Sequence, residues 1–180
     1  SRHKKNPLSD ALAREALRLL GANLIAACED GSNRAAREGM LLGATLAGQA
    51  FANSPVAAVH ALAYPLGGHY HVPHGLSNAL MLGPVLRFNA KAAAPLYAEL
   101  AGVLGVAGTG DAEKRSADFV AHMEKLMDAS GAPRRLRDVG VTDNSLAMLA
   151  ADAMKQTRLL VNNPVEVREE DALALYREAY

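Results

Sequence analysis

Apolar residues recur at intervals of three and four along most of the chain, which is the spacing of one face of an α-helix. The first such stretch begins after Ser9 or Asp10, either of which is a good N-cap, and runs to about Glu29. Gly31 ends it, and a second helix is predicted from about residue 33 to residue 52. The amino-terminal third of the chain is therefore predicted to be two long helices.

Small residues are concentrated in the middle of the second helix, at Gly43, Ala44, Ala47 and Gly48. They favour close packing against another helix, although they would also let a ligand approach the backbone. Further helical periodicity covers residues 76–86, 90–104, 112–129, 146–154 and 169–180. The pattern predicts an all-α helical bundle. Because neither a linker nor a repeat interrupts it, we expect one compact globule.

Four of the six histidines lie between His60 and His74. A short helix over residues 55–66 would carry His60 and Tyr64 on one face, because residues four apart are neighbours on a helix. Gly67 and Gly68 are then expected to reverse the chain, and Pro73 to lead into a helix beginning near His74. The pattern would bring His60 and His74 toward each other across a glycine turn.

Neutral imidazole is the commonest side-chain ligand of transition metals, so this cluster indicates part of a metal site. Two imidazoles complete neither a tetrahedral nor an octahedral coordination sphere, and a single histidine on an apolar helix face is usually a hydrogen-bonded core residue. His69 and His71 alternate on a turn that should face solvent, where a structural or incidental role is the better interpretation.

Composition mainly excludes other classes of function. The 180 residues suffice for one domain that buries about 70% of the surface of its unfolded chain. Nineteen basic residues balance nineteen acidic ones without a long block of either sign, so neither nucleic acid nor membrane is an expected partner. Cys28 is the only cysteine and is expected to be a small buried apolar residue. A cytoplasmic location fits best.

One segment resembles a known signature, that of the iron-containing (group III) alcohol dehydrogenases. The segment reads Ala47-Gly-Gln-Ala-Phe51-Ala-Asn53-Ser-Pro-Val-Ala-Ala-Val-His60-Ala-Leu-Ala-Tyr64-Pro-Leu-Gly-Gly-His-Tyr-His-Val-Pro-His74-Gly75-Leu-Ser-Asn-Ala. The likeness extends over residues 1–180. It implies the helical carboxyl-terminal domain of a two-domain enzyme, a dehydroquinate synthase-like α domain, with the amino-terminal nucleotide-binding domain absent from this chain.

The resemblance also implies roles for individual residues. His60 and His74 match two of the family's three histidine ligands to Fe(II) or Zn(II), whereas the Asp and the remaining His would precede Ser1. Asp10 is not that ligand, because the fourth residue after it is Arg14, which cannot coordinate a cation. Phe51 matches a position that lines the nicotinamide, although core packing is an equal alternative. Tyr64 stands where many members have a histidine that relays the substrate proton.

The reaction implied is oxidation of a small-molecule alcohol, or reduction of an aldehyde, with NAD or NADP. Since the domain that holds the cofactor's phosphates would be missing, the isolated 180-residue chain is expected to be inactive. Because Tyr64 replaces that histidine, a maleylacetate reductase-like branch of the family, with a different substrate, is an alternative. The alternative from another class is a non-catalytic helical binding or assembly fragment with an incomplete metal site. A homo-oligomer is possible for either, because an Ala-rich bundle has apolar faces that associate.

Overall fold

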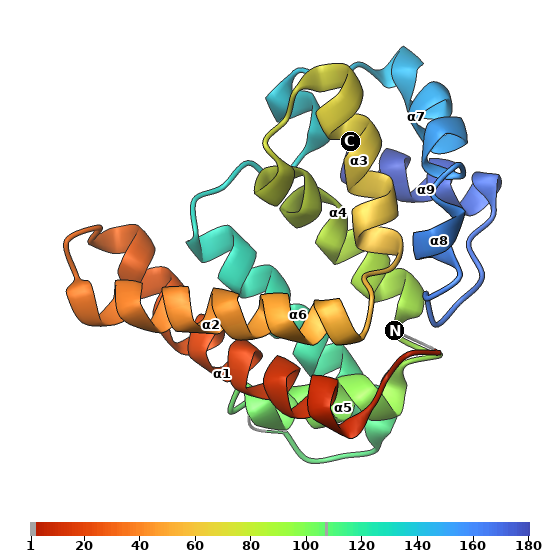
Figure 1. Ribbon diagram of the computed structural model, residues 1–180. Coiled ribbons are helices and arrows are strands. Elements are labelled where there is room, and N and C mark those ends of the chain that lie inside the picture. The colour runs from red at the N-terminus through yellow and green to blue at the C-terminus, as the bar shows by residue number, and fades with distance from the viewer. Residues whose placement is uncertain (1–2, 107) are drawn as a thin grey trace. The chain divides into compact units, whose positions relative to one another are not determined.

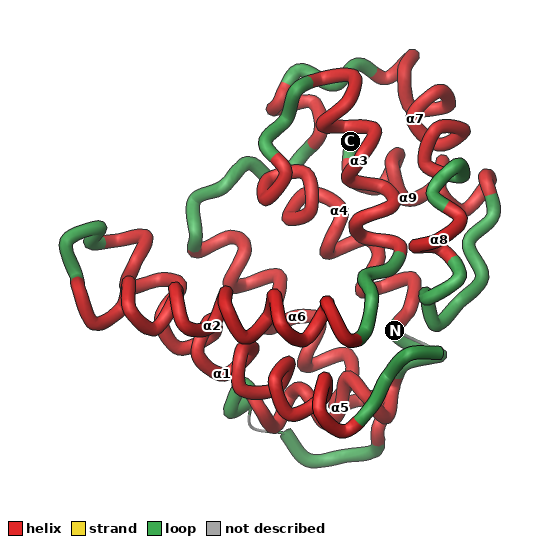
Figure 2. Tube along the Cα trace, viewed as in Figure 1, coloured by secondary structure: helices red, strands yellow, loops and turns green. Residues whose placement is uncertain are grey.

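The computed structural model describes residues 3–106 and 108–180 of the chain. Helices and loops make up this part, and no strand occurs within it (Figure 2). The α-helices are α1 (Pro7–Glu29), α2 (Arg34–Asn53), α3 (Ala58–Tyr70), α4 (His74–Asn89), α5 (Ala94–Val103), α6 (Ala112–Ala129), α7 (Leu146–Ala153), α8 (Thr157–Leu160) and α9 (Glu169–Ala179). Two 3₁₀ turns, η1 (Leu136–Val139) and η2 (Asp143–Ser145), precede α7. The predicted all-α class is confirmed.

Internal contacts divide the chain into two compact units rather than the single globule expected from the sequence. Unit 1 is built mainly from residues 56–92 and 132–180, and unit 2 from residues 4–55 and 93–131. Each unit thus combines segments that are far apart in the chain. The boundary is invisible in the sequence because no linker marks it: the chain passes from one unit to the other inside ordinary loops.

In unit 2, α1 and α2 lie side by side (Figure 1). Gly43 on α2 is buried, and a Cβ atom there would approach Leu20 Cγ of α1 to 2.9 Å. The small residue therefore permits the close helix packing predicted from the sequence. A Cβ on Gly48 would meet only the Phe51 ring at 4.0 Å, so this second glycine is not needed for the α1–α2 contact.

Helix α1 begins earlier than predicted, because its N-cap is Asn6 and not Ser9 or Asp10. The Asn6 side chain accepts a hydrogen bond from Ser9 N at 2.9 Å, and Ser9 Oγ accepts one from Asn6 N at 3.2 Å. This reciprocal capping box, with Pro7 as the first helical residue, satisfies backbone N–H groups at the start of α1. The helix therefore does not use Ser9 or Asp10 as its N-cap. Asp10 instead lies in the first turn, where it forms an ion pair with Lys5.

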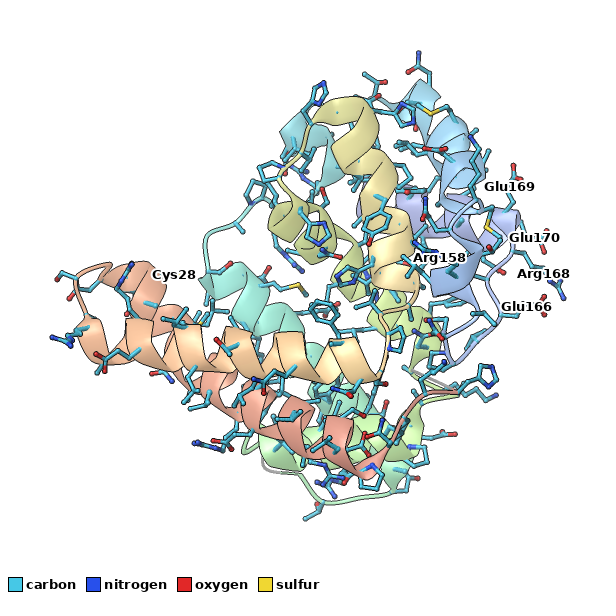
Figure 3. All side chains as sticks on the ribbon, in the orientation of Figure 1. Cys28, Arg158, Glu166, Arg168, Glu169 and Glu170 are labelled. Carbon is cyan, nitrogen blue, oxygen red and sulfur yellow. The ribbon has the colours of Figure 1, made fainter. Side chains whose placement is uncertain are left out.

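Cys28 is exposed, which contradicts the prediction of a buried apolar residue. It lies near the carboxyl-terminal end of α1 (Figure 3), beside an open depression of about 670 Å³ that residues of both α1 and α2 line. Periodicity placed Cys28 one turn after Leu24, but that face of the helix is not covered in unit 2. Within the described residues, no helix combines the length and apolarity that crossing a bilayer requires.

Unit 1 has a core of large apolar side chains. Helix α3 packs on α4, α7 and α8, and α9 packs on α4 and α7. The largest fully buried apolar side chains are those of Leu62, Leu66, Met81, Val85, Leu136, Leu146, Leu149 and Tyr176. Tyr176 on α9 donates a hydrogen bond through its hydroxyl to the Leu62 carbonyl at 2.6 Å. Burial, and secondarily the charge of Asp152, raises the pKa of Tyr176, so this donor keeps its proton. The core and this bond fix α3, which carries the candidate site.

Candidate metal site

The histidine segment folds differently from the predicted glycine turn. Helix α3 continues through Gly67 and Gly68 to Tyr70, and the reversal occurs at His71, whose φ of 53° is left-handed. His71 N bonds to Gly67 O at 3.1 Å, the i→i−4 bond of an αL C-cap motif, and Val72 N bonds to Leu66 O at 3.4 Å. Histidine is one of the non-glycine residues enriched in this conformation. The glycines stay helical because the residues after them supply the cap.

The structure brings His60, Tyr64 and His74 of unit 1 together. His60 and Tyr64 lie one turn apart on α3, as predicted, and their ring centroids are 6.4 Å apart. His74 is the first residue of α4, also as predicted, and its ring centroid lies 5.3 Å from that of His60 and 6.0 Å from that of Tyr64. Three aromatic side chains therefore face one another where α3 and α4 meet.

The separation of the two imidazoles suits shared ligation. Two imidazole rings bound to one tetrahedral ion through bonds of about 2.0–2.1 Å have centroids roughly 5 Å apart. The His60 and His74 centroids are separated by 5.3 Å, with a 56° angle between their planes. Nitrogen donors also suit both Fe(II) and Zn(II). The pair therefore fits a divalent cation in both spacing and donor chemistry.

The surroundings of the three rings are uneven. His60 is half-buried, and its burial, followed by the charge of His74, lowers the pKa of His60 below its ordinary value of 6.5. A neutral ring is the form that ligates a metal. Tyr64 is 40% exposed, and His74 is also exposed. One side of the site is thus anchored in the protein while the other is accessible.

Asn78 is a neighbour of His74 for which the sequence analysis predicted no role. Its side-chain Nδ2 lies 3.1 Å from His74 Nε2 and 3.0 Å from His74 O, one helical turn earlier. Its Oδ1 is buried and makes no hydrogen bond within the described part of the chain. An amide nitrogen only donates, so Nε2 accepts and carries a lone pair. The i,i+4 spacing from His74 was the available signal for this contact.

The other two histidines of the segment lie away from this group. Both His69 and His71 are exposed, as predicted. His69 Nε2 lies 3.0 Å from Asp152 Oδ2, and Asp152 Oδ1 forms an ion pair with Lys155 Nζ at 2.9 Å. Hydrogen bonds from Lys155 and then from His69 lower the pKa of Asp152. The contact with Asp152 at the surface therefore gives His69 a structural role.

Phe51 belongs to α2 of unit 2, and its side chain is 56% exposed. That exposure contradicts the alternative of core packing and leaves the ring available to a ligand. For the residues that the structure describes, no group of three or more His, Cys, Asp or Glu side chains is arranged to hold a metal. The two histidines of α3 and α4 are consequently a partial donor set within this chain.

Comparison with known proteins decides the family. The sequence profile of the carboxyl-terminal part of the Fe-containing alcohol dehydrogenase family matches residues 1–180. The chain belongs to this family. A long-chain-alcohol dehydrogenase of Geobacillus thermodenitrificans and a 1,3-propanediol dehydrogenase of Klebsiella pneumoniae are each 38% identical to it over 176 residues. These matches cover 97% of this chain but only 45% of either relative, so the chain spans less than half the length of the proteins it resembles.

Solved structures of the family share the fold. A 1,3-propanediol oxidoreductase superposes with a TM-score of 0.95 at 36% identity, covering 99% of this chain and 47% of the other. A maleylacetate reductase of Agrobacterium tumefaciens superposes with a TM-score of 0.81 at 26% identity, covering 99% and 47%. The arrangement of helices in this family member is therefore common to enzymes with different named substrates.

Proposed function

We propose that this family member is the helical, metal-binding carboxyl-terminal domain of an NAD(P)-dependent alcohol dehydrogenase or aldehyde reductase. The observation that carries the proposal is the 5.3 Å separation of the His60 and His74 rings, which suits two ligands of one Fe(II) or Zn(II). Family membership supports it, because the relatives are named for dehydrogenation of alcohols or reduction of aldehydes.

Each of the proposed site residues has one task. His60 and His74 would hold the cation, which when bound acts as a Lewis acid on the alcohol or carbonyl oxygen of the substrate. Tyr64, whose ring centroid lies 6.0 Å from that of His74, would exchange a proton with a substrate hydroxyl. Phe51 would present an apolar surface to the nicotinamide, consistent with its exposure. Unit 1 contributes the positions of His60, Tyr64 and His74.

This chain supplies two of the proposed ligands, and its described residues contain no strand. We propose that the remaining ligands and the NAD(P) phosphate site belong to a preceding domain of a longer protein, and that the isolated 180-residue chain is inactive. The substrate would be a small-molecule alcohol or aldehyde, since relatives include a long-chain-alcohol dehydrogenase, a 1,3-propanediol dehydrogenase and a lactaldehyde reductase. A cytoplasmic location stays a prediction.

A second candidate is a non-catalytic helical assembly fragment. It is favoured by the exposed apolar side chains of unit 2, because Leu41 is 71%, Leu42 52% and Phe51 56% exposed. A maleylacetate reductase-like activity is a third candidate within the same family, favoured by Tyr64 in place of a histidine and by the shared fold.

Intact mass of the protein purified from its natural source, together with NAD(P)H turnover on alcohols and aldehydes, separates these candidates. A species much heavier than 18.9 kDa that oxidises alcohols supports the dehydrogenase. A species of about 18.9 kDa without turnover supports the assembly fragment. Turnover of maleylacetate that exceeds turnover of alcohols supports the third candidate.

The ligand assignment is tested in the same active protein by His74→Ala. Its metal content and most of its activity should be lost, while circular dichroism stays unchanged, because an exposed residue at a helix start contributes little to the core. His71→Asn is the matched control, since His71 is an exposed histidine of the same segment and asparagine also adopts its left-handed backbone. Retained turnover in His74→Ala would refute the assignment.

A further inference from the structure

The ring of Tyr64 forms a triangle with the rings of His60 and His74. Its centroid lies 6.4 Å from that of His60 and 6.0 Å from that of His74, and the planes of the Tyr64 and His60 rings meet at 84°. The Tyr64 hydroxyl makes no hydrogen bond within the part of the chain that the structure describes, although the ring is only 40% exposed. Tyr70 of the same helix, in contrast, has its hydroxyl 3.0 Å from Thr142 Oγ1. The Tyr64 hydroxyl thus has no protein partner in the described residues, and its ring adjoins the rings of two potential metal ligands.

The three centroid separations match those of three ligands around one cation. A phenolate oxygen binds a zinc-sized ion at about 2 Å, which places its ring centroid roughly 4 Å from the ion, against roughly 3 Å for an imidazole. At tetrahedral angles, phenolate and imidazole centroids are then separated by roughly 6 Å, and two imidazole centroids by roughly 5 Å. The observed values are 6.4, 6.0 and 5.3 Å. No pair of rings is too close or too distant for a shared ion.

We propose that Tyr64 is a third metal ligand of this chain, completing a His60–Tyr64–His74 donor set. This inference rests on the proposed metal site and replaces the proton-exchange role given to Tyr64 there, because a metal-bound phenolate carries no proton. On binding, the phenolic O–H bond breaks, an oxygen–metal bond forms, and the proton passes to solvent. The phenolate supplies a negative charge that two neutral imidazoles lack, and a hard oxygen donor that suits Zn(II) and iron.

Titration of the chain with zinc sulfate at neutral pH, followed by calorimetry and by the ultraviolet difference spectrum of tyrosinate, tests the proposal. We expect one tyrosinate to appear per chain with the first equivalent of Zn(II). Tyr64→Phe should abolish that signal and weaken binding at least about tenfold, because it removes a charged donor. Tyr70→Phe is the matched control, on the same helix, and should retain both the signal and the affinity.

The outcomes separate this inference from the proposed function. If Tyr64→Phe binds Zn(II) as tightly as the natural chain, or if no tyrosinate forms on binding, Tyr64 is not a ligand, while loss of binding in His60→Ala still supports the histidine pair. If His60→Ala and His74→Ala both bind with unchanged affinity, the proposed metal site itself is wrong, and the three-ligand set fails with it.

Discussion

The two units of this chain differ in the side chains that they bury. Unit 1 buries large side chains, among them Leu149 and Met81 at 0% exposure, and its Tyr176 hydroxyl bonds to a backbone carbonyl inside the core. Unit 2 brings α1 and α2 together over a small residue, Gly43, and leaves Leu41 71% exposed. The core cluster of large buried side chains lies in unit 1, which also holds the candidate site, although unit 2 buries Phe119 and Val120.

This difference has a physical reason. Ligands must be held to within fractions of an ångström, which requires side chains and helices locked by dense packing. A helix pair in contact through glycine and alanine buries less apolar area per residue, so its stability depends more on whatever covers the remaining face. Paired substitutions in the two units test the contrast, and substitutions within unit 1 sharpen it, from the largest expected effect to the smallest.

Leu149→Ala in unit 1 should lower the free energy of unfolding by about 2–5 kcal/mol, because it opens a cavity at a site of 0% exposure. Leu41→Ala in unit 2 should change it by less than about 0.5 kcal/mol. Urea denaturation of both variants measures the difference. Equal losses would mean that Leu41 is covered in solution, and the contrast between the units would disappear.

Gly43→Val in unit 2 should cost about 1–3 kcal/mol, since its side chain would overlap that of Leu20. Gly68→Ala in unit 1 should instead stabilise by up to about 1 kcal/mol, because Gly68 is helical and nothing lies within 4 Å of an added Cβ. Thermal unfolding of the two variants should show lower stability for Gly43→Val and higher stability for Gly68→Ala. A neutral Gly43→Val would show that α1 and α2 separate readily.

Tyr176→Phe should cost about 1 kcal/mol, the net value of its buried hydrogen bond to Leu62 O. Tyr70→Phe, which removes a more exposed hydroxyl contact to Thr142, should cost less than half as much. Hydrogen exchange of α3 amides should report the Tyr176 change locally. If both variants lose the same stability, the Tyr176 hydroxyl does not anchor α3 and α9.

Asp152→Asn should have the smallest effect, less than about 1 kcal/mol at neutral pH, because its pairs with Lys155 and His69 lie near the surface. The pKa of Asp152 is lowered in the folded state below its ordinary 3.8, so the carboxylate stabilises the fold above that pH. This contribution is lost as the pH falls through the folded-state value. The acid limb of the stability profile should therefore be flatter in Asp152→Asn, and an unchanged limb would contradict the pairing.

Local sequence pattern was sufficient to locate most helices. The 112–129 helix was predicted with the bounds that the structure has, because its periodicity is a local feature, and the structure adds Asp111 as its N-cap. The i,i+4 spacing likewise placed His60 and Tyr64 on one face, and Pro73 indicated the helix start at His74. The short turns η1, η2 and α8 escaped prediction because three or four residues carry no periodic signal.

Tertiary structure decided what local pattern could not. Gly67 and Gly68 were read as a turn, yet they stay helical because Val72 packs into the core and its backbone completes the cap at His71. Exposure of Cys28 and the division into two units depend on which helix faces are covered, and segments far apart in the chain determine that. The sequence by itself determined which residues could share a helix face. Only the fold decided which faces meet, because packing is a property of residues brought together from distant positions in the chain.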